Sequence, residues 1–159
     1  MDAPWIAVIG PGAADAADID RAEGVGAALA EAGAVLVCGG LGGVMEAACR
    51  GARVAGGLTI GLLPGDARAA ANEWVQIAIP TGLGEARNAL VVRAASAVIA
   101  IGGGWGTLSE MALALRAGKP VVGLESWAPT PPDGRDPGVI VAVDAAAAVR
   151  AALQAISAV

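Results

Sequence analysis

The residues best suited to chemistry lie in one short segment, Gly103-Gly104-Trp105-Gly106-Thr107-Leu108-Ser109-Glu110. Because glycine has no side chain, its backbone N–H groups can approach an anion such as a phosphate, and the start of a following helix attracts the same charge. Thr107 and Glu110 have the spacing of a capping box, in which both side chains bind free amides at the start of a helix. Alternatively, Glu110 places a carboxylate beside a bound ribose or phosphate. The residues alone leave both interpretations open.

Two further glycine-rich turns can approach an anion in the same way. They are Gly10-Pro11-Gly12 and Gly39-Gly40-Leu41-Gly42-Gly43, and each follows a short apolar run. One such turn is explained as well by the tight geometry of a strand-to-helix connection, but three of them favour a ligand that carries a phosphate. The residues that we predict to bind this ligand are Gly10, Gly12, Gly39, Gly40, Gly42, Gly43, Asn88, Gly103, Gly104, Gly106 and Thr107.

Arg87 and Asn88 lie near the start of the helix expected before segment 103–110. A cation in the first turn of a helix opposes the helix dipole, so helix stability does not explain Arg87. A phosphate or carboxylate of a ligand would explain it, and an ion pair with Glu85 or another acid is the alternative. Asn88 can donate a hydrogen bond to a ligand or to a loop carbonyl. Trp105, inside the glycine-rich segment, can stack on a base or cover the edge of the sheet.

Several familiar sites are excluded by residues that the chain lacks. It has no histidine, which excludes Ser–His–Asp and Cys–His catalysis and any metal site that needs imidazole, and we predict no metal site. Gly10-Pro11-Gly12 is followed by Asp15 where the dinucleotide fingerprint requires a third glycine. The single lysine, Lys119, is not part of a GK[ST] motif. Ordinary NAD(P) dehydrogenases and P-loop NTPases are therefore disfavoured.

The composition predicts one folded domain that spans residues 1–159. Hydrophobic residues make up 56% of the chain and charged residues 16%, which excludes intrinsic disorder, and a net charge of −5 argues against nucleic acid and anionic membranes as partners. The longest stretch without charge, residues 94–109, is too short and too rich in glycine to span a membrane. Because the chain also lacks the basic start of a signal peptide, we predict a cytoplasmic protein. Cys38 and Cys49 form no CxxC motif, so we expect two buried thiols, with a disulfide as the alternative.

Short apolar runs alternate with alanine-rich segments along the chain. We predict strands at residues 5–9, 34–38, 58–63, 74–79, 97–101, 120–124 and 139–143, and helices at 19–32, 44–55, 84–95, 108–117 and after Asp144. Strands that are apolar on both faces and separated by helices require a mainly parallel sheet covered on both sides, a doubly wound, Rossmann-like α/β sandwich. In such a sheet the ligand binds beyond the carboxyl ends of the strands, where all three glycine-rich turns fall.

The motif Gly103-Gly104-x-Gly106-Thr107-x-x-Glu110, with Arg87 before it and the segments 8–12 and 38–47, resembles the Lonely Guy (LOG) family, formerly called lysine decarboxylase-like. The resemblance covers residues 5–124, and it is strongest to a bacterial branch related to molybdenum cofactor carrier proteins. LOG enzymes hydrolyse the N-glycosidic bond of cytokinin nucleoside 5′-monophosphates. It therefore implies Glu110 as the catalytic carboxylate at the ribose, Arg87 as the positioning cation, and the glycine turns as the phosphate site.

Two positions differ from the LOG pattern: Asn88 stands where these enzymes have lysine, and Gly102 where they have proline. The lost lysine removes a charge near the substrate. The prediction is therefore a phosphoribohydrolase or, as the alternative, a carrier that binds molybdenum cofactor or a related phosphorylated pterin or nucleotide unchanged. A third interpretation is a regulatory module with a vestigial pocket. No further cofactor is required. Decarboxylation is disfavoured because Lys119 suits a helix C-terminal charge, and the resemblance implies a homo-oligomer, a dimer or tetramer.

Overall fold

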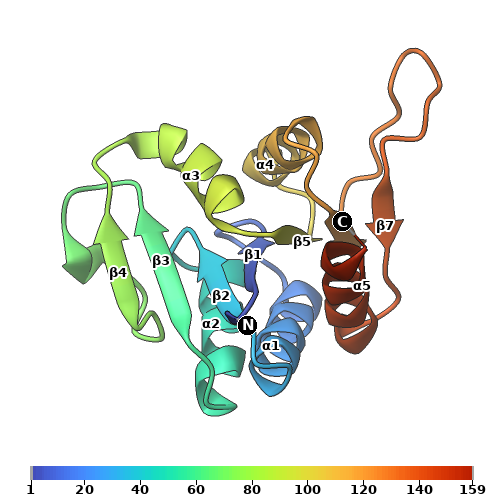
Figure 1. Cartoon of the computed structure of the whole chain (residues 1–159). Coiled ribbons are helices and arrows are strands. Elements are labelled where there is room, and N and C mark those ends of the chain that lie inside the picture. Colours follow the sequence, from blue (N-terminus) through green and yellow to red (C-terminus); the bar gives the residue numbers. More distant parts are fainter. Residues whose placement is uncertain (1, 159) are drawn as a thin grey trace.

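Seven parallel strands form a single sheet in the computed structural model, which describes residues 2–158, and helices cover both faces of this sheet (Figure 1). The strands are β1 (Trp5–Ile9), β2 (Val35–Cys38), β3 (Thr59–Leu63), β4 (Ile77–Pro80), β5 (Ala97–Ile101), β6 (Val121–Leu124) and β7 (Val139–Val141). The helices are α1 (Ala16–Glu31), α2 (Val44–Val54), α3 (Arg87–Ala94), α4 (Trp105–Arg116) and α5 (Ala145–Ser157), with short 3₁₀ turns η1 (Arg68–Ala70) and η2 (Gly84–Ala86). The predicted doubly wound α/β sandwich is therefore confirmed.

The apolar runs form the centre of the sheet because both of their faces are covered. Every residue of β2, β3, β5 and β6 is buried, whereas the edge strands β4 and β7 are partly exposed. One hydrophobic cluster packs α1, α2 and α5 against the sheet, and the second packs α3 and α4 against the opposite face (Figure 1). A strand that is buried on both faces consists of consecutive apolar residues, because neither face needs polar side chains.

The strand order is β4-β3-β2-β1-β5-β6-β7, so the topological switch point, where the direction of strand addition reverses, lies between β1 and β5. These two strands pair in parallel, with Ile9 opposite Ala100. From β1 the chain passes through α1 to β2 on one side, and from β5 it passes through α4 to β6 on the other. The turns after β1 and β5 therefore leave the sheet in opposite directions, and open α/β sheets bind ligands in the crevice that results.

Several element boundaries differ from those expected. Helix α1 begins at Ala16, because the carboxylate of Asp15 caps it by accepting a 2.8 Å hydrogen bond from Asp18 N. The expected strand at 74–79 is β4, which starts only at Ile77, and the helix expected from Gly84 begins as the 3₁₀ turn η2. Strand β7 ends at Val141 rather than at residue 143.

Both cysteines lie in the interior of the protein. Cys38 and Cys49 are free and buried, with their sulfur atoms 3.5 Å apart, so the thiol prediction is confirmed. Within residues 2–158, no helix combines the length and the apolar character that crossing a membrane requires.

Candidate functional site

A cavity of about 540 Å³ opens at the carboxyl ends of β1 and β5, between their turns and the helices α3 and α4. Its walls come from the turn after β1, the segment around the start of α2, the residue after β3, the turn η2 with the start of α3, and the first two turns of α4. The lining residues are Gly10, Pro11, Gly12, Leu41, Met45, Pro64, Gly84, Glu85, Arg87, Asn88, Gly104, Gly106, Thr107 and Glu110. The cavity therefore lies where the fold leads us to expect a ligand.

Most of the predicted site residues meet in this cavity, but the second glycine-rich turn does so only partly. The predicted residues that line it are Gly10, Gly12, Arg87, Asn88, Gly104, Gly106, Thr107 and Glu110, and those that do not are Gly39, Gly40, Gly42, Gly43 and Gly103. The region after β2 contributes Leu41 and Met45 instead. Gly43 has a φ of 64° and lies so close to the backbone of Pro11 and Gly12 that a Cβ would clash there, which gives it a packing role.

Arg87 is the first residue of α3, and its side chain is almost completely buried. Its Nη1 donates a 2.6 Å hydrogen bond to Oδ1 of Asn88, whereas its Nε has no hydrogen-bond partner. The three ion pairs found among residues 2–158 do not include Arg87, so the alternative of an ion pair with Glu85 is wrong. The Oδ1 of Asn88 therefore holds the guanidinium, and the expected donation from its amide nitrogen to a ligand stays a prediction.

The start of α4 differs from the predicted capping box. The helix begins at Trp105, its N-cap is Gly104, and no side chain caps it. Thr107 therefore lies inside the first turn and Glu110 in the second, so neither can act as the capping pair. The reason is that Gly104 already has the extended backbone of an N-cap, with φ −69° and ψ 152°. The amides of this first turn have no partner within the helix and no capping side chain.

Thr107 and Glu110 are both buried in the wall of the cavity. The hydroxyl oxygen of Thr107 has no hydrogen-bond partner, although the residue is only 2% exposed. Burial raises the pKa of Glu110 to about 7, while the nearby Arg87 cation acts in the opposite direction. A carboxyl group with a pKa near neutrality can donate or accept a proton, which is what general acid–base chemistry requires.

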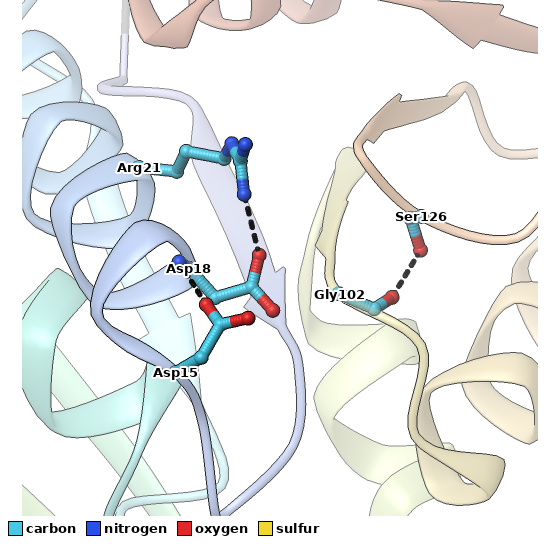
Figure 2. Close-up of polar contacts among 5 residues, drawn as sticks. All are labelled: Asp15, Asp18, Arg21, Gly102 and Ser126. Carbon is cyan, nitrogen blue, oxygen red and sulfur yellow. Dashed lines mark hydrogen bonds and ion pairs between the residues drawn. The ribbon is translucent and has the colours of Figure 1, made fainter.

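The start of α1, by contrast, is closed to anions. The Asp15 carboxylate caps this helix, and Asp18, in its first turn, forms a 2.9 Å ion pair with Arg21 (Figure 2). Two carboxylates at a helix start repel a phosphate and already occupy the dipole end. Figure 2 also shows the Oγ of Ser126 donating a 2.7 Å hydrogen bond to the carbonyl of Gly102, which fixes the turn before α4. Of these two helices, α4 is the one that can receive an anion.

The sequence did not indicate several residues of the cavity wall. Leu41, Met45 and Pro64 are apolar and carry no chemical signal. Leu41 and Pro64 follow the carboxyl ends of β2 and β3 closely, and Met45 lies at the start of α2. Glu85 lies in η2, immediately before α3, and brings an exposed carboxylate to the cavity. The position of Leu41 and Pro64 just after β2 and β3 is the signal that could have identified these two.

The chain belongs to the SLOG cluster4 family, whose sequence model matches residues 3–150, and this confirms the predicted relationship to the LOG superfamily. It is 39% identical to the molybdenum cofactor binding protein of Rippkaea orientalis, with a TM-score of 0.85 and 99% of this chain and 98% of that chain covered. It is 37% identical to the molybdenum cofactor carrier protein of Chlamydomonas reinhardtii, with a TM-score of 0.87 and coverages of 98% and 99%.

Two further proteins are similar to the chain, one in sequence and one in fold. An uncharacterised protein of Archaeoglobus fulgidus is 46% identical over 120 residues, which are 76% of this chain and 79% of that protein. DNA processing protein A of Helicobacter pylori is 20% identical with a TM-score of 0.68, and 95% of this chain and 80% of that chain are covered. At this identity the likeness concerns the fold alone.

Proposed function

We propose that the chain binds a phosphorylated pterin or nucleotide in the cavity at the start of α4 and carries it without changing it, with molybdenum cofactor as the preferred cargo. Support comes from the two solved structures described above, which are similar over almost the whole chain and are described as binding or carrying molybdenum cofactor. The uncapped start of α4 and the Arg87 guanidinium supply the positive charge that a phosphate needs.

The observation that carries this proposal is a pair of unsatisfied polar atoms. Thr107 Oγ1 and Arg87 Nε are both buried without a partner, and both belong to residues that line the cavity. An unsatisfied buried donor lowers the stability of a fold by about 1–3 kcal/mol, and native proteins contain few of them. A phosphate is the kind of acceptor that both groups lack, so a ligand that reached them would explain atoms that the folded chain leaves unpaired.

The experiment compares two arginines of the same helix. The wild-type chain, Arg87→Met and the control Arg93→Met are incubated without oxygen with molybdenum cofactor released from a molybdenum enzyme, and the pterin that stays with the protein on gel filtration is measured. Arg93 is in the last turn of α3 and does not line the cavity. We expect retention by the wild type and by Arg93→Met, and at least a tenfold weaker binding by Arg87→Met. Failure of the wild type to retain pterin, or equal retention by all three proteins, would contradict the proposal.

Hydrolysis of a nucleotide is a second candidate, and one specific observation favours it. Glu110 lines the same cavity as Arg87, and its pKa of about 7 suits a group that transfers protons. In this reaction water replaces the base at C1′ of the ribose, which yields the free base and ribose 5-phosphate. Chromatography of AMP or a cytokinin monophosphate after incubation should show both products with the wild type and neither with Glu110→Gln. If the wild type leaves the nucleotide intact, hydrolysis is rejected and the carrier function remains.

A further inference from the structure

Trp105 is the feature of this region that the proposed function does not yet use. Its indole is 78% exposed, although it is the first residue of a helix whose buried residues, Thr107, Glu110, Met111 and Ala114, anchor it to the protein. The chain contains neither phenylalanine nor tyrosine, so the few aromatic rings are all tryptophans. The packing of α4 therefore does not require the indole of Trp105.

A second tryptophan holds this indole in place. The ring of Trp127 lies against that of Trp105, with 5.1 Å between the ring centroids and 35° between the ring planes. Its Nε1 donates a 3.0 Å hydrogen bond to the carbonyl of Gly104, the N-cap of α4. The hydroxyl of the neighbouring Ser126 donates a hydrogen bond to the carbonyl of Gly102, so Ser126 and Trp127 are both fixed to the turn that precedes the helix. The two rings therefore form a preorganised aromatic surface.

This surface adjoins the proposed phosphate site. Trp105 lies between Gly104 and Gly106, which both line the cavity, while its ring lies outside the cavity lining. A Cβ on Gly103 or on Gly106 would meet no other atom within 4 Å, so no neighbouring side chain covers the backbone of these two glycines. A ligand whose phosphate binds the first-turn amides therefore lies beside the residue that carries the indole.

The following inference rests on the proposed function. We propose that Trp105, supported by Trp127, is the platform on which the planar heterocycle of the phosphorylated ligand stacks. Indole rings bind the faces of heteroaromatic rings irrespective of their substituents, and such stacking raises affinity by roughly one to two orders of magnitude per ring. The helix start then selects the phosphate and the tryptophan pair selects a flat ring system. The expected ligand class is a phosphate ester of a pterin or purine, in preference to a sugar phosphate without a ring system.

The test uses neopterin monophosphate as the probe and ribose 5-phosphate as the matched ligand without a heterocycle, with affinities measured by calorimetry. We expect Trp105→Ala to weaken binding of neopterin monophosphate about tenfold and to leave ribose 5-phosphate unchanged. Trp105→Phe, which keeps an aromatic ring, should restore part of the loss. Trp5→Ala is the control, since Trp5 is also exposed but begins β1 at the opposite end of the sheet.

The other outcomes separate this inference from the proposed function. If Trp105→Ala binds both ligands like the wild type while Arg87→Met loses both, the platform is wrong and the phosphate site stands. If the wild type binds neither ligand, both proposals fall. If Trp105→Ala changes only the molar mass measured by light scattering, the indole belongs to a contact between copies of the chain, and the platform is likewise overturned.

Discussion

The guanidinium of Arg87 lies directly against Gly39, the first residue after β2: a Cβ on Gly39 would be 2.5 Å from Nη1 of Arg87. The backbone of Gly39 is not in the left-handed region, so the turn itself does not require glycine there. Glycine is needed because the arginine side chain fills the space. This contact connects the second glycine-rich turn to the cavity, although Gly39 does not line it.

Substitution Gly39→Ala should therefore affect binding more than stability. The added methyl group displaces the end of a flexible side chain rather than backbone, so the unfolding free energy should fall by less than about 1 kcal/mol. Binding of a pterin phosphate, measured by calorimetry, should weaken about tenfold because the guanidinium moves. Gly65→Ala is the control, since a Cβ at Gly65 meets no atom within 4 Å. Equal affinity of the two variants would show that the position of Arg87 against Gly39 is unimportant for binding.

The unpaired hydroxyl of Thr107 leads to an unusual expectation for stability. Because Thr107 Oγ1 is buried without a partner, Thr107→Val should leave the unfolding free energy unchanged or raise it by up to about 1 kcal/mol. Thr59 is the matched control: its hydroxyl donates to the carbonyl of Trp74 and accepts from the amide of Gln76. Thr59→Val should lower stability by about 1–2 kcal/mol. Urea denaturation of both variants measures this, and a large destabilisation by Thr107→Val would mean that the hydroxyl does have a partner in the folded protein.

Much of the fold could be predicted because its strands are continuous apolar runs ended by glycine. The strands at 5–9 and 97–101 have the same bounds in the sequence prediction and in the structure. The start of α4 could not be predicted, because Gly104 and Gly106 disfavour a helix while Thr107 with Glu110 matches a capping box. The backbone conformation of Gly104 decides between these alternatives, and this conformation cannot be predicted from the residue types.

The arrangement of the candidate site depends even more on tertiary structure. Arg87 could be singled out because its charge opposes the dipole of its own helix. Its contact with Gly39 and its nearness to Glu110 could not be predicted, since they depend on the strand order and on α3 and α4 sharing one face of the sheet. The closed start of α1 was equally hidden, because Asp15 was not expected to cap that helix.

The buried carboxyl of Glu110 should make stability depend on pH. Burial raises its pKa from an ordinary 4.5 to about 7, so the folded state holds this proton more tightly than the unfolded state. The stabilisation is complete below about pH 4.5 and is lost as pH rises to about 7. Above pH 7, Glu110→Gln should therefore be more stable than the wild type by about 3 kcal/mol.

The measurement is urea denaturation at a series of pH values. The advantage of Glu110→Gln should shrink as pH falls and disappear near pH 4.5. Glu31→Gln, at the exposed end of α1, serves as the control for loss of a surface carboxylate. Binding of a phosphate ester should also weaken as pH rises through 7 in the wild type, because an ionised Glu110 repels it. A stability difference that does not change with pH would contradict the assignment of this proton to Glu110.

The single lysine should prove structural. Lys119 Nζ donates hydrogen bonds to the carbonyls of Val92, Arg93 and Ala95, at and just beyond the C-terminal end of α3. Hydrogen bonds from a charged donor to a helix end stabilise by about 2 kcal/mol, so Lys119→Met should lower the unfolding free energy by about that amount. Binding of pterin phosphate at a temperature where the variant is folded should be unchanged. Loss of binding without loss of stability would instead place the amine in the functional site.

Two glycines of the first turn should respond in opposite ways to the same substitution. A Cβ on Gly10 would be 2.6 Å from the carbonyl oxygen of Ile101 and from the side chain of Val44, so Gly10→Ala should lower stability by about 1–3 kcal/mol. A Cβ on Gly12 would meet no atom within 4 Å and would project into open space, so Gly12→Ala should change stability by less than about 0.5 kcal/mol. Because Gly12 lines the cavity, its alanine variant should weaken binding of a pterin phosphate, measured by calorimetry, through steric overlap with the ligand. If Gly12→Ala binds as tightly as the wild type, the ligand does not approach the turn after β1, and the first of the three glycine-rich turns serves only the packing of β1 against α2 and β5.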